Sequence, residues 1–137
     1  MGEVRTEITL VNIEDQGVAN RGYMPQEQVR RLTVNAVVDT GAWTLIINEE
    51  TRDKLGLRVE ETRKSTVAGG GTVPSQVTEW VEIRWKNRKA SCRAVVLSGE
   101  EDILLGAYPL EGLDLMILPK TQEVTGAHGD KRYNVVK

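Results

Sequence analysis

Residues 37–42 read VVDTGA. Two β-branched residues lead directly into Asp39, which is followed by Thr40 and Gly41. A buried carboxylate costs free energy unless a hydrogen bond or an opposite charge compensates for it. Asp and Gly are also ordinary turn residues. The stretch therefore predicts either a strand that ends in a plain turn or a strand that presents a catalytic carboxylate.

The residues before Asp39 have the pattern of a half-buried strand. From residue 30 to residue 38, apolar and polar side chains alternate. A period of two places the apolar side chains on one face of a sheet and the polar ones on the other. Asp39 is then expected at the C-terminal end of this strand. The apolar face consists of Leu32, Val34, Ala36 and Val38.

Strand patterns dominate the rest of the chain. Two extended arms flank the glycine-rich stretch 68–71, which predicts a long hairpin because glycine tolerates turn conformations. The fold class predicted is all-β, a small closed barrel-like lobe with a hairpin and one or two short helices. The expected strands are residues 6–13, 30–38, 45–47, 57–67, 77–85, 90–97 and 113–118, with weaker signals near 124 and 133–136; residues 16–28 are expected to form a loop.

Two short helices are predicted, at residues 48–56 and 107–112. Asn48 can accept a hydrogen bond from the first turn of the first helix, and Gly56 can end that helix in a left-handed conformation. Acidic residues follow the cap and basic residues precede the end, which suits the helix dipole.

Composition limits the functions that are open to this chain. A length of 137 residues fits one domain, residues 1–137. The net charge is −2, which gives no support for a nucleic-acid or membrane partner. The single cysteine, Cys92, allows no intrachain disulfide and favours a reducing compartment. No apolar signal segment follows Met1 and no apolar run is long enough to span a bilayer, so a cytoplasmic location is expected.

One carboxylate alone hydrolyses peptides poorly, because attack by water needs both a general base and a general acid. Two carboxylates about 3 Å apart can share one proton and divide these roles. The chain has a single Asp-[Ser/Thr]-Gly sequence, at residues 39–41. A catalytic pair therefore requires a second copy, which a two-fold symmetric dimer supplies by placing Asp39 beside its symmetry mate.

In three features the sequence resembles the retropepsin-like aspartic proteases, which include the retroviral proteases and their single-lobe bacterial relatives. These are the apolar strand into the DTGA sequence, the glycine-rich hairpin, and the apolar-apolar-glycine element at residues 104–106 before a short helix. The resemblance covers about residues 30–125. Residues 1–29 form an N-terminal extension with an extra strand and loop, and residues 126–137 a C-terminal strand or tail. Trp43 stands where smaller or polar residues are common in the family.

The resemblance implies an aspartic endopeptidase that acts as a homodimer on an extended peptide or protein, at mildly acidic pH and without a metal or other cofactor. Asp39 is the implied catalytic residue, and Thr40 the residue that joins the two loops of a dimer. Flap residues close over the substrate. The implied site residues are Asp39, then Thr40, Gly41 and Ala42 in the active-site loop, Ala68, Gly69, Gly70 and Gly71 in the flap, and Leu104, Leu105 and Gly106 in the supporting loop.

Other interpretations stay open at this stage. The same lobe can serve as a non-catalytic homodimeric peptide-binding or scaffold module. The hairpin glycines do not fit a phosphate-binding loop, because the Lys and Ser/Thr that should follow them are missing. Cys92 lies in an alternating strand and is expected in the core rather than as a nucleophile. The charged run at residues 60–64 is expected to be solvated.

Overall fold

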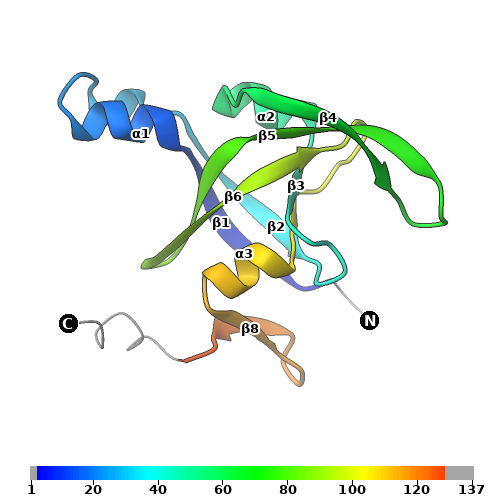
Figure 1. The fold of residues 1–137 in the computed structure, drawn as a ribbon. Helices are drawn as coiled ribbons and strands as arrows, with labels where there is room; N and C mark the ends of the chain where they lie inside the picture. Colours follow the sequence, from blue (N-terminus) through cyan, green and yellow to red (C-terminus); the bar gives the residue numbers. More distant parts are fainter. Residues whose placement is uncertain (1–2, 129–137) are drawn as a thin grey trace.

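The computed structural model describes residues 3–128, and nearly half of these lie in β-strands. The prediction of an all-β lobe with short helices is confirmed (Figure 1). The strands are β1 (Arg5–Asn12), β2 (Arg31–Val38), β3 (Leu45–Ile47), β4 (Val59–Thr66), β5 (Thr72–Trp85), β6 (Arg88–Val96), β7 (Leu104–Leu105), β8 (Leu115–Leu118) and β9 (Glu123–Gly126). The helices are α1 (Ile13–Asn20), the 3₁₀ helix η1 (Gln26–Gln28), α2 (Glu49–Leu55) and α3 (Ala107–Gly112).

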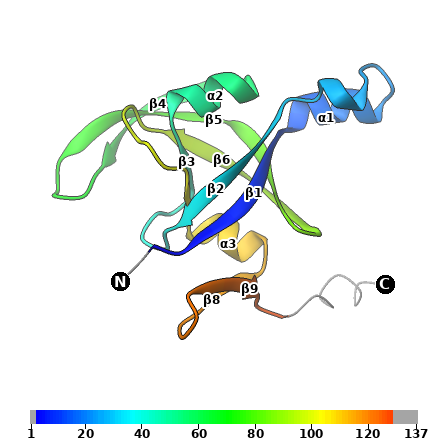
Figure 2. The ribbon, with the colours of Figure 1, turned by 180° about the vertical axis from the view of Figure 1, so that it is seen from behind.

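The main sheet closes into a ring. Its seven strands follow the order β1-β2-β7-β3-β6-β5-β4. Strand β1 pairs antiparallel with β2, and its last residues also pair with β5, from Thr9↔Arg84 to Asn12↔Val81. This second pairing joins the two sides of the sheet, while β4 extends outside the ring as one arm of a hairpin with β5 (Figures 1 and 2). The predicted closed barrel-like lobe is confirmed, and β1 is one of its strands.

Aliphatic side chains fill the ring, as a chain without phenylalanine requires. Ile8 and Leu10 of β1 are buried in one cluster with Ile83 of β5. Trp85 is also buried, and its indole Nε1 donates a hydrogen bond of 2.8 Å to Thr6 Oγ1. A fully buried aliphatic side chain stabilises the fold by roughly 2 kcal/mol, so the ring is a firm frame for the loops at its rim.

The predicted helix boundaries are confirmed at both ends of α2. The Asn48 side chain accepts a hydrogen bond of 2.9 Å from the Thr51 amide, which caps the first turn. Gly56 ends the helix with φ 64° and ψ 31°, the left-handed conformation that glycine adopts at low cost. Both signals are local in sequence, which explains why they could be read without the structure.

Strands β8 and β9 form a separate two-stranded sheet beside α3 (Figure 2). The weak strand signal near Val124 corresponds to β9. The predicted strand at residues 133–136, and the tail beyond residue 128, lie outside the described residues. No helix within residues 3–128 has the length and apolar character needed to cross a membrane.

The prediction of a loop at residues 16–28 is wrong, because this segment contains most of α1 and all of η1. Helix α1 begins at a cap in which the Asn12 side chain accepts a hydrogen bond of 2.9 Å from the Asp15 amide. Its surface lacks a continuous apolar stripe, so the periodicity that usually reveals a helix is missing. The only local signal was the capping pair Asn12 and Asp15.

A buried carboxylate ties α1 to the barrel. Asp15 is buried and accepts hydrogen bonds from Arg30 Nε at 2.7 Å, Arg30 Nη2 at 2.9 Å and the Arg30 amide at 3.0 Å. The side-chain hydrogen bonds from Arg30 hold the pKa of Asp15 below its ordinary value of 3.8. Arg30 directly precedes β2. This contact therefore attaches α1 to the start of the strand that leads to Asp39.

We expect Asp15→Asn to lower the free energy of unfolding at neutral pH by about 2 kcal/mol, because the charged hydrogen bonds to Arg30 are lost. The folded pKa of Asp15 lies below the unfolded one. Its stabilisation is therefore fully present above about pH 4 and is lost as the pH falls through the folded pKa. Urea unfolding at pH 7 and below pH 4 measures both effects. The wild type should lose more stability on acidification than Asp15→Asn, and an equal loss in the two proteins contradicts the role given to Asp15.

Candidate active site

Strand β2 delivers Asp39 to the rim of the ring. It pairs in parallel with β7, with Val37 opposite Leu104 and Val38 opposite Leu105. The Asp39 amide continues this pairing by donating to the Leu105 carbonyl at 3.0 Å. The chain then turns, and the Ala42 amide donates to the Asp39 carbonyl at 3.0 Å. Asp39 is therefore held by the backbone on both sides, at the buried end of β2.

The carboxylate of Asp39 is half-buried and receives a hydrogen bond from its own loop. The Gly41 amide donates to Asp39 Oδ1 at 2.9 Å. A side chain at residue 41 would bring its Cβ to 3.2 Å from the same oxygen, so a glycine keeps this approach open. Thr40 and Gly41 are exposed at the tip of the loop, beside the carboxylate.

The segment after β7 packs directly behind this loop. Gly106 donates its amide to the Thr44 carbonyl at 3.1 Å, and Ala107 donates to the Ala42 carbonyl at 2.9 Å. A Cβ on Gly106 would lie 2.3 Å from the Thr44 carbonyl oxygen and 2.6 Å from that of Ala42. Because backbone atoms cannot move aside cheaply, only glycine fits here. The two segments, 60 or more residues apart in sequence, form one hydrogen-bonded unit at the rim.

The glycine-rich stretch is the tip of the β4–β5 hairpin. The two arms pair in register up to Thr66↔Thr72. Gly69 and Gly70 have φ values of 94° and 88°, which a side chain would disfavour. The tip residues Ala68, Gly69, Gly70 and Gly71 are all exposed, and the hairpin extends away from the ring (Figure 1).

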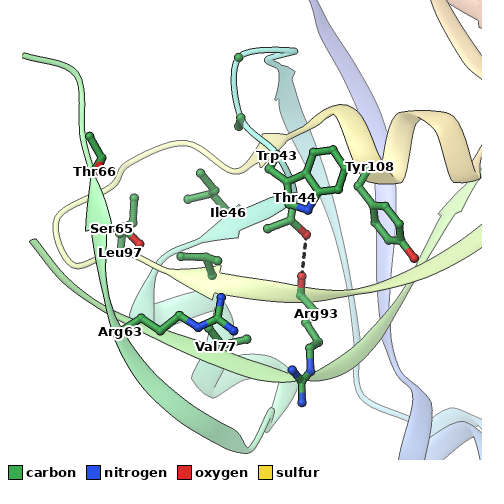
Figure 3. A pocket seen from close by; sticks show the side chains of 13 residues that line it. Trp43, Thr44, Ile46, Arg63, Ser65, Thr66, Val77, Arg93, Leu97 and Tyr108 are labelled. Atoms are coloured by element: carbon green, nitrogen blue, oxygen red, sulfur yellow. Dashed lines mark hydrogen bonds between the residues drawn. The ribbon is translucent and has the colours of Figure 1, made fainter. Parts of the chain in front are cut away.

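A cavity of about 470 Å³ lies between the loop at residues 39–42 and the β4–β5 hairpin (Figure 3). Its walls come from the loop and β3, from the β4 and β5 arms, from β6, and from α3. The lining is mostly apolar, and its ionisable side chains are two arginines and one tyrosine. The lining residues are Gly41, Ala42, Trp43, Thr44, Ile46, Arg63, Ser65, Thr66, Val77, Arg93, Val95, Leu97 and Tyr108.

Trp43 and Tyr108 form an aromatic pair at the edge of the cavity. Their ring centroids are 5.8 Å apart and the rings are tilted by 39°. Trp43 is 71% exposed and Tyr108 is 41% exposed, which is unusual for side chains of this size. The Tyr108 amide also donates to the Trp43 carbonyl at 2.8 Å. The ring of Trp43 therefore forms a wall at the cavity mouth.

Sequence reasoning missed Arg63, Arg93 and Tyr108 as cavity residues. The charged run at residues 60–64 is largely exposed, as expected, and Arg63 also lines the cavity. Glu60 and Glu61 form ion pairs with the two arginines. Nothing in the local sequence distinguishes these side chains from ordinary surface charge. Their position depends on the pairing of β5 between β4 and β6, which brings distant residues to one surface.

Other ionisable groups give no competing centre within the described residues. Cys92 is buried, as predicted, and burial raises the pKa of its thiol, which disfavours a nucleophilic thiolate. Residues 3–128 contain no group of three or more His, Cys, Asp or Glu side chains that could hold a metal ion. Asp39, at the rigid rim of the ring and beside a cavity, is therefore the carboxylate whose position best suits a catalytic role.

Comparison with known families gives a match over more than half of the chain. The model of a family described as aspartyl protease matches residues 27–108. This range includes the Asp39 loop, the glycine hairpin and Gly106. A comparison with curated protein sequences found no match.

Solved structures share the fold. EIAV protease complexed with the inhibitor HBY-793 superimposes with a TM-score of 0.58 and 21% sequence identity, over 85% of this chain and 93% of that chain. The retroviral protease-like domain of Ddi1 from Leishmania major gives a TM-score of 0.57 and 18% identity, over 91% of this chain and 88% of that chain. At this level of identity the matches establish the fold of the lobe.

Proposed function

The chain belongs to the aspartyl protease family, and we propose that it hydrolyses peptide bonds as a homodimer in which each copy contributes one Asp39. The observation that carries this proposal is the position of Asp39 at the end of β2, in a loop held from behind by Gly106. Family membership supports a peptidase in general terms. The dimer, the paired carboxylates and the turnover of a substrate each have an experiment below.

On this proposal, one copy of the chain lacks the second carboxylate that the reaction needs. The sequence contains a single Asp-Thr-Gly, so the second carboxylate must come from another chain. Like charges about 3 Å apart do not both ionise easily, so the pair holds one proton between them. One carboxylate then takes a proton from the attacking water while the other donates to the carbonyl of the peptide. The proposal needs no metal and no organic cofactor.

Several neighbouring elements would position the substrate. An extended peptide between the Asp39 loop and the β4–β5 hairpin could bind through main-chain hydrogen bonds, as an added strand does. The exposed tip at residues 68–71 would close over it and exclude water. The 470 Å³ cavity lies beside this path and would receive one side chain of the peptide. Thr40, exposed at the loop tip, would face its counterpart across the dimer axis.

A non-catalytic peptide-binding module is the second candidate. The cavity is complete within one chain and does not depend on a pair of carboxylates. A module of this kind would bind peptides whether or not the two copies of Asp39 meet. Hydrolysis that requires Asp39 distinguishes the two functions, as set out in the Discussion.

We expect the peptidase activity per chain to depend on protein concentration. Below the dissociation constant of the dimer, the dimeric fraction is proportional to the total concentration, so a twofold dilution should roughly halve the activity per chain. Cleavage of a peptide library across a dilution series, with sedimentation velocity at the same concentrations, measures this relation. Constant activity per chain in a range where only monomer sediments contradicts the requirement for a dimer.

A further inference from the structure

Two arginines from different strands line the cavity beside Asp39. Arg63 reaches it from β4 and Arg93 from β6 (Figure 3). No carboxylate is among the lining residues, so the charged groups that face the cavity are both cationic. The remaining walls are largely apolar, with Ile46, Val77 and Leu97 among them. An apolar wall lowers the local dielectric and strengthens the interaction of a guanidinium with an anion.

The charges that face these arginines from the neighbouring strands are two glutamates of β4. The Glu61 carboxylate contacts both guanidiniums, through Arg63 Nε and, at 3.6 Å, through Arg93 Nη1. Glu60 contacts Arg93 Nη2. These ion pairs hold both side chains in place, since one carboxylate bridges the two strands. They engage only part of the hydrogen-bonding capacity of the guanidiniums.

Donors are left over on both arginines. No group within residues 3–128 accepts a hydrogen bond from Arg63 Nη1 or Nη2, and the side chain of Arg63 is 58% exposed. Arg93 Nη1 lies 3.6 Å from Glu61, beyond hydrogen-bond distance, and no group within the same residues accepts a hydrogen bond from it. These guanidinium donors can bond to an acceptor of a bound peptide. A carboxylate matches the planar fork of a guanidinium better than a neutral amide does.

We propose that this cavity binds an acidic side chain, Asp or Glu, of the peptide, and that Arg63 and Arg93 determine this specificity. The inference rests on the proposed function, because it assigns the cavity to the peptide held beside Asp39. The glutamates that already contact both arginines, and the solvent that reaches Arg63, weaken the attraction. We therefore expect a preference for the acidic peptide of about tenfold, below the full strength of a buried ion pair.

The test measures binding in a variant that cannot turn over its ligand. Asp39→Asn is titrated into pairs of fluorescent peptide pools that carry Glu or Gln at one defined position among otherwise random residues. Fluorescence anisotropy at about pH 6.5, where a peptide Glu is ionised, gives the two affinities. At one position or more, the Glu pool should bind about tenfold more tightly than the Gln pool. This ratio should fall as the salt concentration rises toward about 1 M.

Two further variants in the same background assign the preference to the arginines. Arg63→Gln removes one guanidinium, and Arg93→Lys keeps the charge but removes the planar fork; each should reduce the ratio of Glu to Gln affinity. Lys64→Gln is the matched control, because Lys64 lies next to Arg63 on β4, is exposed and does not line the cavity. It should leave the ratio unchanged. Thermal unfolding of each variant verifies that it is folded.

The outcomes separate the inference from the proposed function. Equal binding of the Glu and Gln pools at every position overturns the inference, and so does a preference that Arg63→Gln and Arg93→Lys both retain. Hydrolysis by the wild type is measured separately on the same pools. Preference without hydrolysis supports the acidic subsite and contradicts the peptidase proposal, whereas hydrolysis without preference does the reverse.

Discussion

Replacing Asp39 with Asn is expected to lower kcat/KM for peptide hydrolysis by at least about a thousandfold, because in a dimer the substitution removes both members of the acid–base pair. Asparagine keeps the size of the side chain and can still accept the hydrogen bond from the Gly41 amide. The loop should therefore retain its conformation. Cleavage of a mixed peptide library at acidic to neutral pH, followed by mass spectrometry, measures the loss.

A matched carboxylate-to-amide change provides the control. Asp53 lies on α2 with its side chain 70% exposed, and its ion pair with Arg52 is at the surface. Asp53→Asn should cleave at the wild-type rate, since exposed pairs contribute little to stability. If Asp39→Asn and the wild type cleave equally, the peptidase proposal is wrong. If neither cleaves although sedimentation shows a dimer, the peptide-binding module becomes the better account.

The second large effect concerns the glycine behind the loop. Gly106→Ala would place a Cβ 2.3 Å from the Thr44 carbonyl oxygen and 2.8 Å from the Thr44 nitrogen. These are backbone atoms within the unit that holds Asp39, so the strain cannot be relieved by rotating a side chain. We expect the free energy of unfolding to fall by about 3 kcal/mol, the upper end of the usual cost of overpacking. Urea unfolding gives the stability, and the peptide assay should show a parallel loss of activity.

A glycine-to-alanine change in α1 should raise the free energy of unfolding instead of lowering it. Gly17 lies within α1, and a Cβ there would meet no atom within 4 Å. Gly17→Ala should stabilise the protein by about 0.5 to 1 kcal/mol, because alanine loses less entropy in a helix. A Gly106→Ala protein as stable as the wild type would show that the loop and the β7–α3 segment are not packed as tightly as their geometry indicates.

Some features of this fold follow from short stretches of sequence. The alternation before Asp39 predicts β2, and Asn48 and Gly56 predict the ends of α2. Each signal acts through contacts between residues that are close in the chain, so its physical meaning does not depend on the rest of the fold. The glycine hairpin is of the same kind, since Gly69 and Gly70 adopt the positive φ values that their residue type permits.

Helix α1 shows where local signals fail. Its polar sequence has no apolar stripe, and it is held by the partly buried ion pair between Asp15 and Arg30, 15 residues further along the chain. The expectation of a loop was wrong because a long-range contact outweighed a weak local preference. Strand β1, likewise, closes the ring only because its last residues pair with β5 as well as with β2.

For this protein, the sequence by itself determined the class of the fold, the strand that presents Asp39, the hairpin tip, and the need for a second copy if two carboxylates are to meet. These rest on side-chain alternation, turn chemistry and the single Asp-Thr-Gly. Only the tertiary structure decided which residues surround the cavity. Arg63, Arg93 and Tyr108 come from separate elements, and their meeting depends on strand pairing over long separations, which local patterns do not encode.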